Sequence, residues 1–389
     1  MSVAAPGTAP PSLLVFAGEG GVGKTTLAAA TALKASLSGL RVAVMTIDPA
    51  PRLADALGLD RLDDEPLLVA NPEPGSDNAG SLHALRLDTT GTFDRMVDRL
   101  ADDNTVAERI KANPIYQAVA ASTGSSAPYM AFQRLHELAE SGRWDLIVVD
   151  TPPALHAEEL LSAPSRLAGL LNTRAVALLV DPARAAAGHG TRLARATATL
   201  LLGMVERVTG AGLVGQVSSF VADFARLIES MVERSRDVEA MLAAPTSCFV
   251  LVSRACAASN HAGLALRGEL LGRGFAVAPM VTNRLTPRPA TVVAAGESKA
   301  DLPADAPPGC RELLDRINSE LKQLHETETV AIAELEDASQ GAVLRVHDLA
   351  GEAGSLEDLG LLAAELTELG ELLATAVRSG PQEYSGSLD

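Results

Sequence analysis

The chain has 389 residues, of which 47% are hydrophobic and 21% charged, and this ordinary globular composition excludes disorder along the whole chain. Its formal net charge of −17 disfavours binding to nucleic acid or to anionic lipid, and no basic patch in the sequence offsets that charge. Aromatic residues make up only 3%, so stacking of bases on aromatic rings is not the expected mode of recognition.

The N-terminal residues 1–12 contain prolines and no basic residue, so they lack the charged and apolar regions of a signal peptide. We expect them to be a disordered leader. The remaining residues, 13–389, contain no uninterrupted apolar run long enough for a membrane helix. Three cysteines without a C-x-x-C motif favour a reducing compartment over a disulfide framework or a zinc site. The sequence therefore predicts a cytoplasmic protein with no stable membrane insertion and no zinc.

Short, continuous aliphatic runs alternate with segments of helical length. Such runs are typical of parallel strands that helices cover on both faces, so the sequence predicts an α/β fold with a doubly wound, mostly parallel sheet. The runs are Leu13–Phe16, Val42–Met45, Leu146–Val149, Val176–Val180, Phe249–Val252 and Ala276–Val281. Thr25–Ser38 and His261–Arg273 have the length of crossover helices.

Two spans, at about 90–141 and 185–244, interrupt this alternation with helical patterns. We expect them to form a helical subdomain inserted into a single domain that covers residues 13–389. Phe220, Phe224 and Ile228 in the second span follow one another at helical spacing near several methionines. They could line an apolar groove for a hydrophobic protein client, or they could fill a core.

The strongest chemical signal follows the first aliphatic run. Residues 18–25 match the phosphate-loop pattern G-x-x-x-x-G-K-[ST] between a strand and a helix. In such a loop, backbone N–H groups point at phosphates, Lys24 would reach the β and γ phosphates, and Thr25 would offer its hydroxyl to Mg²⁺. The predicted nucleotide-binding residues are Gly18, Glu19, Gly20, Gly21, Val22, Gly23, Lys24, Thr25 and Thr26.

Two aspartates follow later aliphatic runs. Asp150 comes directly after Leu146–Val149, as expected of the aspartate that supports the Mg²⁺ shell through water. Asp48 follows the second run, and ligands of doubly wound sheets bind at the carboxyl ends of the strands. Asp48 should therefore face the nucleotide, although it could instead cap the helix that follows it.

These segments resemble the ArsA and Get-type ATPase family over nearly all of the chain. The segments that carry the resemblance are residues 18–26, 46–50, 150–156 and 282–284. The family belongs to the deviant Walker class of P-loop NTPases, within the SIMIBI class, and the resemblance implies dimers that bind ATP and Mg²⁺. It also implies switch regions that pass the nucleotide state to a client-binding helical subdomain.

The resemblance assigns roles to individual positions of this sequence. Asp48 would activate the attacking water, so Asp48 and Lys24 are the predicted catalytic residues. Asp48 and Pro49 would form the first switch, His156 would lie in the second switch, and Asn283 would read the adenine edge.

Glu19 departs from this class, in which the corresponding lysine contacts phosphate across the dimer interface. A carboxylate directed at phosphates from about 4 Å would cost about 4 kcal/mol per charge pair at an effective dielectric constant near 20. Glu19 should therefore turn away, pair with a cation or be offset by Mg²⁺. Nucleotide binding should survive, while hydrolysis is in doubt. The chain could act as an ATPase in a homodimer, or as the weakly hydrolysing or non-hydrolysing subunit of a heterodimer with a lysine-bearing relative.

Other members of the class fit less well. A ParA- or MinD-like positioning ATPase would show a basic DNA-binding face or a basic membrane helix, whereas residues 356–377 are amphipathic and acidic. A nitrogenase-reductase-like protein would need cysteines after the second switch, and none occurs between Asp150 and Cys248. The first switch also departs from many relatives, because it reads Pro51-Arg52 where they carry a histidine and a small polar residue.

Overall fold

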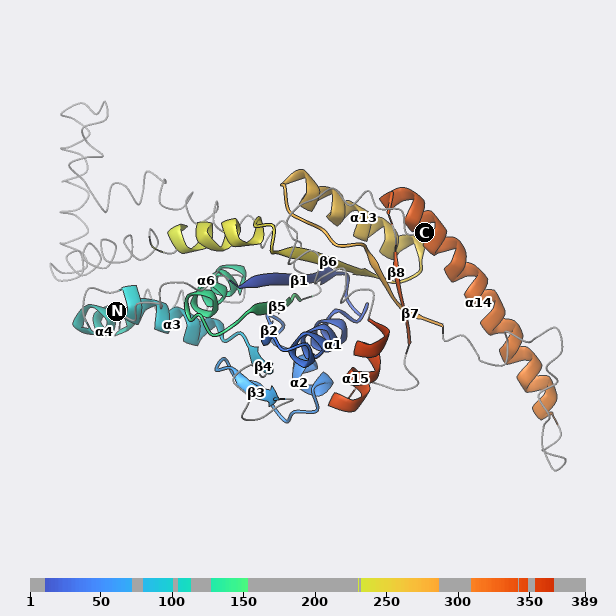
Figure 1. Ribbon diagram of the computed structural model, residues 1–389, viewed down its shortest axis with the longest axis horizontal. Coiled ribbons are helices and arrows are strands. Elements are labelled where there is room, and N and C mark those ends of the chain that lie inside the picture. The colour runs from blue at the N-terminus through green and yellow to red at the C-terminus, as the bar shows by residue number, and fades with distance from the viewer. Residues whose placement is uncertain are drawn as a thin grey trace, which may run out of the picture. The chain divides into compact units, whose positions relative to one another are not determined.

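The computed structural model describes residues 11–71, 80–100, 104–112, 127–152, 230, 232–286, 309–341, 343–348 and 354–366. Within these residues one eight-stranded sheet has the order β3-β4-β2-β5-β1-β6-β7-β8 (Figure 1). The strands are β1 Ser12–Gly18, β2 Arg41–Thr46, β3 Leu67–Ala70, β4 Ser81–Arg86, β5 Leu146–Asp150, β6 Cys248–Ser253, β7 Val281–Leu285 and β8 Leu344–His347. Only β3 runs antiparallel to its neighbour, which confirms the predicted doubly wound, mostly parallel α/β fold.

The described residues belong to two compact units, one of residues 1–86, 142–157 and 241–389 and one of residues 87–141 and 158–240. The first unit holds the sheet and the helices α1 Lys24–Leu37, α2 Arg52–Ala56, α13 Ala257–Gly272, α14 Cys310–Ser339 and α15 Leu356–Glu365. The second unit holds α3 Thr89–Leu100, α4 Asn104–Ala112 and α6 Ala127–Glu140. None of the described helices is both long and apolar enough to cross a membrane.

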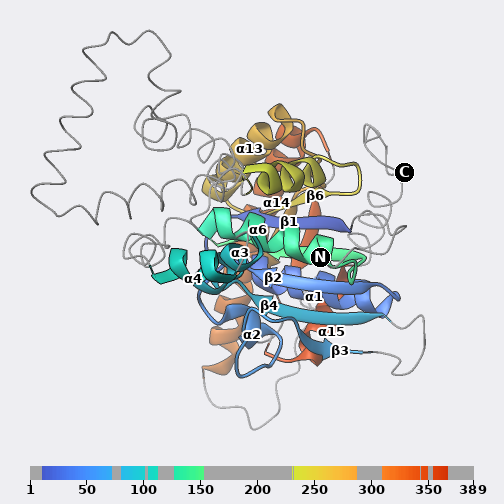
Figure 2. The same ribbon diagram turned by 90° about the vertical axis from the view of Figure 1, so that its left-hand side faces the viewer.

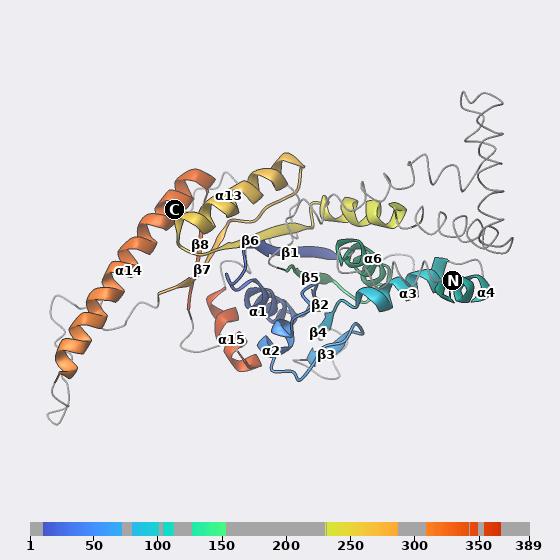
Figure 3. The same ribbon diagram turned by 180° about the vertical axis from the view of Figure 1, so that it is seen from behind.

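Helices cover both faces of the sheet because successive strand residues point to opposite sides. Leu14 of β1 and Val148 of β5 are buried in one core with Leu27 of α1 and Leu359 of α15. The connection from β6 through α13 to β7 runs in the opposite direction along the sheet from that of β1, α1 and β2. A right-handed crossover therefore places α13 on the other face (Figure 3).

The last helix of the described residues, α15, packs against α1. Apolar residues of α15, among them Leu359 and Leu362, are buried in the core that α1 shares. The Lys34 ammonium of α1 donates a hydrogen bond to the Ala363 carbonyl at 3.0 Å. This bond places a positive charge beside carbonyl groups near the C-terminal end of α15, where the helix dipole is negative.

In the second unit, whose helices α3, α4 and α6 face the viewer in Figure 2, a charged network links α3 and α6. Glu137 of α6 is buried, and its carboxylate lies 2.8 Å from Arg134 of the same helix. Arg95 and Arg99 of α3 approach the same carboxylate at 3.5 and 3.6 Å. A buried carboxylate with several arginine partners fixes how α3 and α6 pack, because breaking the set would leave an uncompensated charge.

One predicted strand needs correction. In the run Ala276–Val281, only Val277 forms a bridge, to Phe249 of β6, and the strand β7 begins at Val281. The N–H of Phe249 donates to the carbonyl of Ala276, and the carbonyl of Phe249 accepts from the N–H of Ala278. The next residue, Pro279, has no N–H and cannot continue this pairing.

Several predictions fall on residues outside the described part of the chain. They are the strand Val176–Val180, the groove residues Phe220, Phe224 and Ile228, and nearly all of the leader 1–12. The boundaries of the helical subdomain and of the single domain 13–389 stay predictions.

Candidate functional site

The phosphate loop joins β1 to α1, and two of its glycines are required by close backbone contacts. Gly18 has φ 147°, and a Cβ on it would lie 2.2 Å from the carbonyl oxygen of Val252 in β6. Gly23 has φ 91°, and a Cβ on it would lie 2.2 Å from the side-chain nitrogen of Asn283 in β7. Glycine at both positions therefore lets the loop lie against the ends of β6 and β7 before α1 begins.

Lys24, the first residue of α1, folds back over the loop. Its ammonium donates hydrogen bonds to the carbonyls of Gly18 at 2.9 Å and Glu19 at 2.7 Å. Burial lowers the pKa of Lys24, while the nearby carboxylates of Asp150 and Asp48 act in the opposite direction. An ammonium held only by neutral carbonyls can exchange them for phosphate oxygens, which accept stronger hydrogen bonds.

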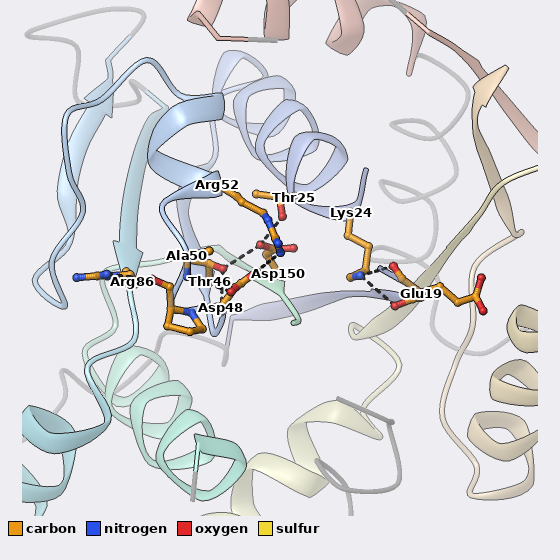
Figure 4. Close-up of polar contacts among 11 residues, drawn as sticks. Glu19, Lys24, Thr25, Thr46, Asp48, Ala50, Arg52, Arg86 and Asp150 are labelled. Carbon is orange, nitrogen blue, oxygen red and sulfur yellow. Dashed lines mark hydrogen bonds and ion pairs between the residues drawn. The ribbon is translucent and has the colours of Figure 1, made fainter. Parts of the chain in front are cut away.

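Asp150 ends β5 and is fully buried beside the loop (Figure 4). Its Oδ2 accepts hydrogen bonds from the hydroxyls of Thr25 and Thr46, both at 2.9 Å. Its Oδ1 has no hydrogen-bond partner among the described residues. Burial raises the pKa of Asp150 to about 6, although the two hydroxyls and Lys24 partly offset this rise.

The pair formed by Thr25 and Asp150 fits the predicted Mg²⁺ site. Mg²⁺ is bound by oxygen, usually through one or two carboxylates, substrate phosphates and several waters. The unpartnered Oδ1 of Asp150 is a carboxylate oxygen of this kind, next to a threonine hydroxyl in the loop. Within the described ranges, no group of three or more His, Cys, Asp or Glu side chains could hold a metal ion.

Asp48 lies in the loop after β2, where its side chain is nearly buried. Its Oδ1 accepts a hydrogen bond from the backbone N–H of Ala50 at 3.0 Å, and its Oδ2 accepts one from Arg52 at 2.5 Å. Arg86, the last residue of β4, donates to the carbonyl of Pro49 at 3.2 Å. Asp48 does not cap α2, whose N-cap is Pro51, and its carboxylate faces Arg52 and the phosphate loop (Figure 4).

The other predicted site residues lie in different places. Asn283 is buried, and its amide donates to the carbonyl of Val22 at 2.8 Å, so it contacts the loop, while its role toward adenine stays a prediction. Glu19 is exposed, and its carboxylate points away from Lys24 (Figure 4). Gly20 and Gly21 are exposed parts of the loop. Thr26 is half-buried in the first turn of α1, and His156 lies outside the described residues.

Two residues of the site have no predicted role. Thr46 joins β2 to Asp150, and Arg52 pairs with Asp48. The signal for Arg52 is its spacing, because a cation four residues after an acid at a helix start is within reach of it. The signal for Thr46 is its place at the carboxyl end of a strand beside Asp150.

Comparison with known sequences gives a consistent result. The sequence model of the anion-transporting ATPase family matches residues 12–340. Protein Rv2184c of Mycobacterium tuberculosis is 34% identical over 167 residues, which are 39% of this chain and 37% of that protein. The ATPase ASNA1 homolog of Dictyostelium discoideum is 31% identical and the ATPase GET3 of Malassezia globosa 27% identical, each over 39% of this chain and 41% of the relative. The chain thus matches less than half the length of each of these relatives.

Proposed function

Because the chain belongs to the anion-transporting ATPase family, we propose that it binds ATP with Mg²⁺ at residues 18–26 and hydrolyses the ATP to ADP and phosphate. The observation that carries this proposal is the hydrogen bond between Thr25 of the loop and Asp150 of β5, together with the unpartnered Oδ1 of Asp150. The bond brings a loop hydroxyl and a strand-end carboxylate together from 125 residues apart in sequence.

The residues of the site divide the chemistry between them. Lys24 exchanges its two carbonyl acceptors for phosphate oxygens. Thr25 and Asp150 would hold Mg²⁺, which would neutralise phosphate charge. Asp48 accepts a hydrogen bond from the attacking water and orients it. The water oxygen bonds to the γ-phosphorus, the bond from that phosphorus to the bridging oxygen breaks, ADP leaves with the bridging oxygen, and the water proton passes to phosphate or solvent.

The same proposal includes a dimer whose nucleotide state reaches the second unit. The two segments of that unit follow β4 and β5 in the chain, the strands whose carboxyl ends carry Arg86 and Asp150. Arg86 bonds to the first-switch residue Pro49, and α3 begins only three residues after Arg86. A change in the first switch can therefore reach α3 through a very short connection. The partner could be a second copy or a lysine-bearing relative, and the client a hydrophobic protein segment.

The first test is steady-state phosphate release by the purified chain with Mg²⁺ and ATP, together with nucleotide affinity from a fluorescent ATP analogue. Lys24→Ala should weaken ATP affinity severely, because the phosphates lose the loop's one lysine. Asp48→Asn should retain affinity within about threefold and lose about 10²-fold or more in turnover, since a positioned base contributes about that much. Unchanged affinity in Lys24→Ala would refute the loop assignment, and undiminished turnover in Asp48→Asn would remove Asp48 from its role.

A binding subunit without turnover is the second candidate, and Glu19 favours it. Glu19 carries a carboxylate where the class has a lysine, so it supplies no positive charge to the phosphates. This carboxylate is exposed and points away from Lys24 (Figure 4). Saturable ATP binding by the wild type without phosphate release, and release after Glu19→Lys, would identify this second function. Release by the wild type that Lys24→Ala abolishes would exclude it.

A further inference from the structure

We propose that Arg52 supplies the positive charge at the γ-phosphate that Glu19 cannot supply, and that Arg52 leaves Asp48 for the phosphate when ATP with Mg²⁺ binds. This inference rests on the proposed ATPase function and names a further catalytic residue of the same site. Its starting point is the ion pair between Arg52 and Asp48, the residue proposed to orient the attacking water.

The geometry of the ion pair allows this exchange. Arg52 is the first residue of α2, and its guanidinium lies 2.5 Å from Oδ2 of Asp48. The side chain of Arg52 is 57% exposed, whereas that of Asp48 is 10% exposed, so the arginine reaches inward from solvent to a nearly buried acid. An exposed side chain on a surface helix can move without disturbing the core, and the acid that it leaves stays held by the N–H of Ala50.

Arg52 also lies near Lys24, the proposed phosphate-binding group. Burial is the main cause of the lowered pKa of Lys24, and the positive charge of Arg52 lowers it further. Arg52 and Lys24 therefore lie close enough to interact, and Figure 4 shows the guanidinium directed from α2 toward the centre of the site. A triphosphate entering between the two cations would offer oxygens that bind the planar guanidinium in pairs, a stronger arrangement than its single bond to Asp48.

The exchange also accounts for what Asp48 must do. While Oδ2 accepts a hydrogen bond from Arg52 and Oδ1 accepts one from Ala50, both carboxylate oxygens have a protein donor. Transfer of Arg52 to phosphate leaves Oδ2 without its protein donor, so that the attacking water can donate to it in place of Arg52. One movement thus places a cation on the developing charge and releases the group that orients the water.

The experiment compares wild type, Arg52→Gln, Arg52→Lys, Glu19→Lys and the double variant Arg52→Gln with Glu19→Lys. The matched control is Arg345→Gln. Arg345 lies on β8, the edge strand at the opposite end of the sheet from β3, and forms a 2.8 Å ion pair with Glu336 of α14. The readouts are kcat and KM for ATP, and the affinity for Mg²⁺–ADP with and without aluminium fluoride, which mimics the transferring phosphoryl group.

We expect Arg52→Gln to lower kcat by about 10²-fold and the aluminium fluoride-dependent gain in ADP affinity by about tenfold or more. Its affinity for ADP alone should stay within about twofold of wild type, and Arg345→Gln should match wild type throughout. Arg52→Lys should retain an intermediate rate. The double variant should regain most of the lost rate, because Glu19→Lys returns a cation to the phosphates.

Two results would overturn the inference. Either an undiminished rate and aluminium fluoride effect in Arg52→Gln, or a loss that Glu19→Lys does not recover, would show that Arg52 only braces the Asp48 loop. Failure of the proposed function is a separate result, since wild type would then neither bind ADP nor release phosphate. If wild type binds ADP without turnover, the aluminium fluoride measurement still decides the role of Arg52.

Discussion

Replacing Asp150 with asparagine should stabilise the metal-free chain while removing its affinity for Mg²⁺. Burial raises the pKa of Asp150 from 3.8 to about 6. Since the folded chain then holds this proton over a range in which the unfolded chain has lost it, stability falls as the pH rises from about 4 to about 6. A difference of about two pKa units corresponds to about 3 kcal/mol in the free energy of unfolding at higher pH.

Asparagine does not ionise, and its carbonyl oxygen can accept the hydrogen bonds of Thr25 and Thr46 that Oδ2 now accepts. Its amide group would replace the unpartnered Oδ1, and an unsatisfied buried donor costs about 1–3 kcal/mol. The net gain expected at pH 8 without metal is therefore up to about 2 kcal/mol, and it becomes a net loss at about pH 4, where the wild-type carboxyl is protonated. In return, the variant should show no Mg²⁺-dependent increase in nucleotide affinity.

The assay is urea unfolding in a chelating buffer at several pH values, followed by the fluorescence of Trp144. This residue is the one tryptophan of the chain and is buried next to β5. Asp145→Asn is the control of opposite sign, because hydrogen bonds from Arg41 lower the pKa of Asp145, so its contribution to stability is present at high pH and lost on acidification. A less stable Asp150→Asn at pH 8, or a difference that does not change with pH, would refute this reasoning.

Two further predictions concern the loop and the cysteines. Gly18→Ala should lower the free energy of unfolding by about 2–4 kcal/mol, because its Cβ would meet the Val252 carbonyl. Gly21→Ala has open space around it and should lower that free energy by only about 1 kcal/mol. Equal thermal midpoints for the two variants would contradict this prediction. In the native chain a maleimide should label exposed Cys256 and spare Cys248, whose burial raises its pKa to about 12. Peptide mass spectrometry measures both, and early labelling of Cys248 would show that β6 opens.

Much of the sheet could be predicted because its central strands are covered on both faces. The runs at 13–16, 42–45, 146–149 and 249–252 all lie within strands of the structure, since burial on both sides leaves no polar position to interrupt them. The strands β3 and β4 were not predicted. β3, Leu67–Ala70, is a short apolar run at the edge of the sheet with exposed Leu67 and Leu68, and β4 alternates more polar with apolar residues.

The site was predictable where one segment of sequence contains the whole signal. The glycines, Lys24 and Thr25 belong to one loop, and Asp48 and Asp150 each end a recognisable run. The contacts between segments were not predictable. The bond from Asn283 to Val22 depends on how closely β7 approaches the loop, and that distance is not encoded in the spacing of residues along the chain.

The packing of α15 against α1 shows that recognisable family similarity and the folding unit end at different places. The family match stops at residue 340, yet Leu359 and Leu362 fill the core beside the helix that starts at the phosphate loop. Burying one leucine contributes about 1.5–3 kcal/mol, so losing α15 and β8 would remove a large part of a typical net stability. A chain shortened to its family-matched residues would retain every predicted nucleotide-binding residue and still expose to water the face of α1 that α15 covers.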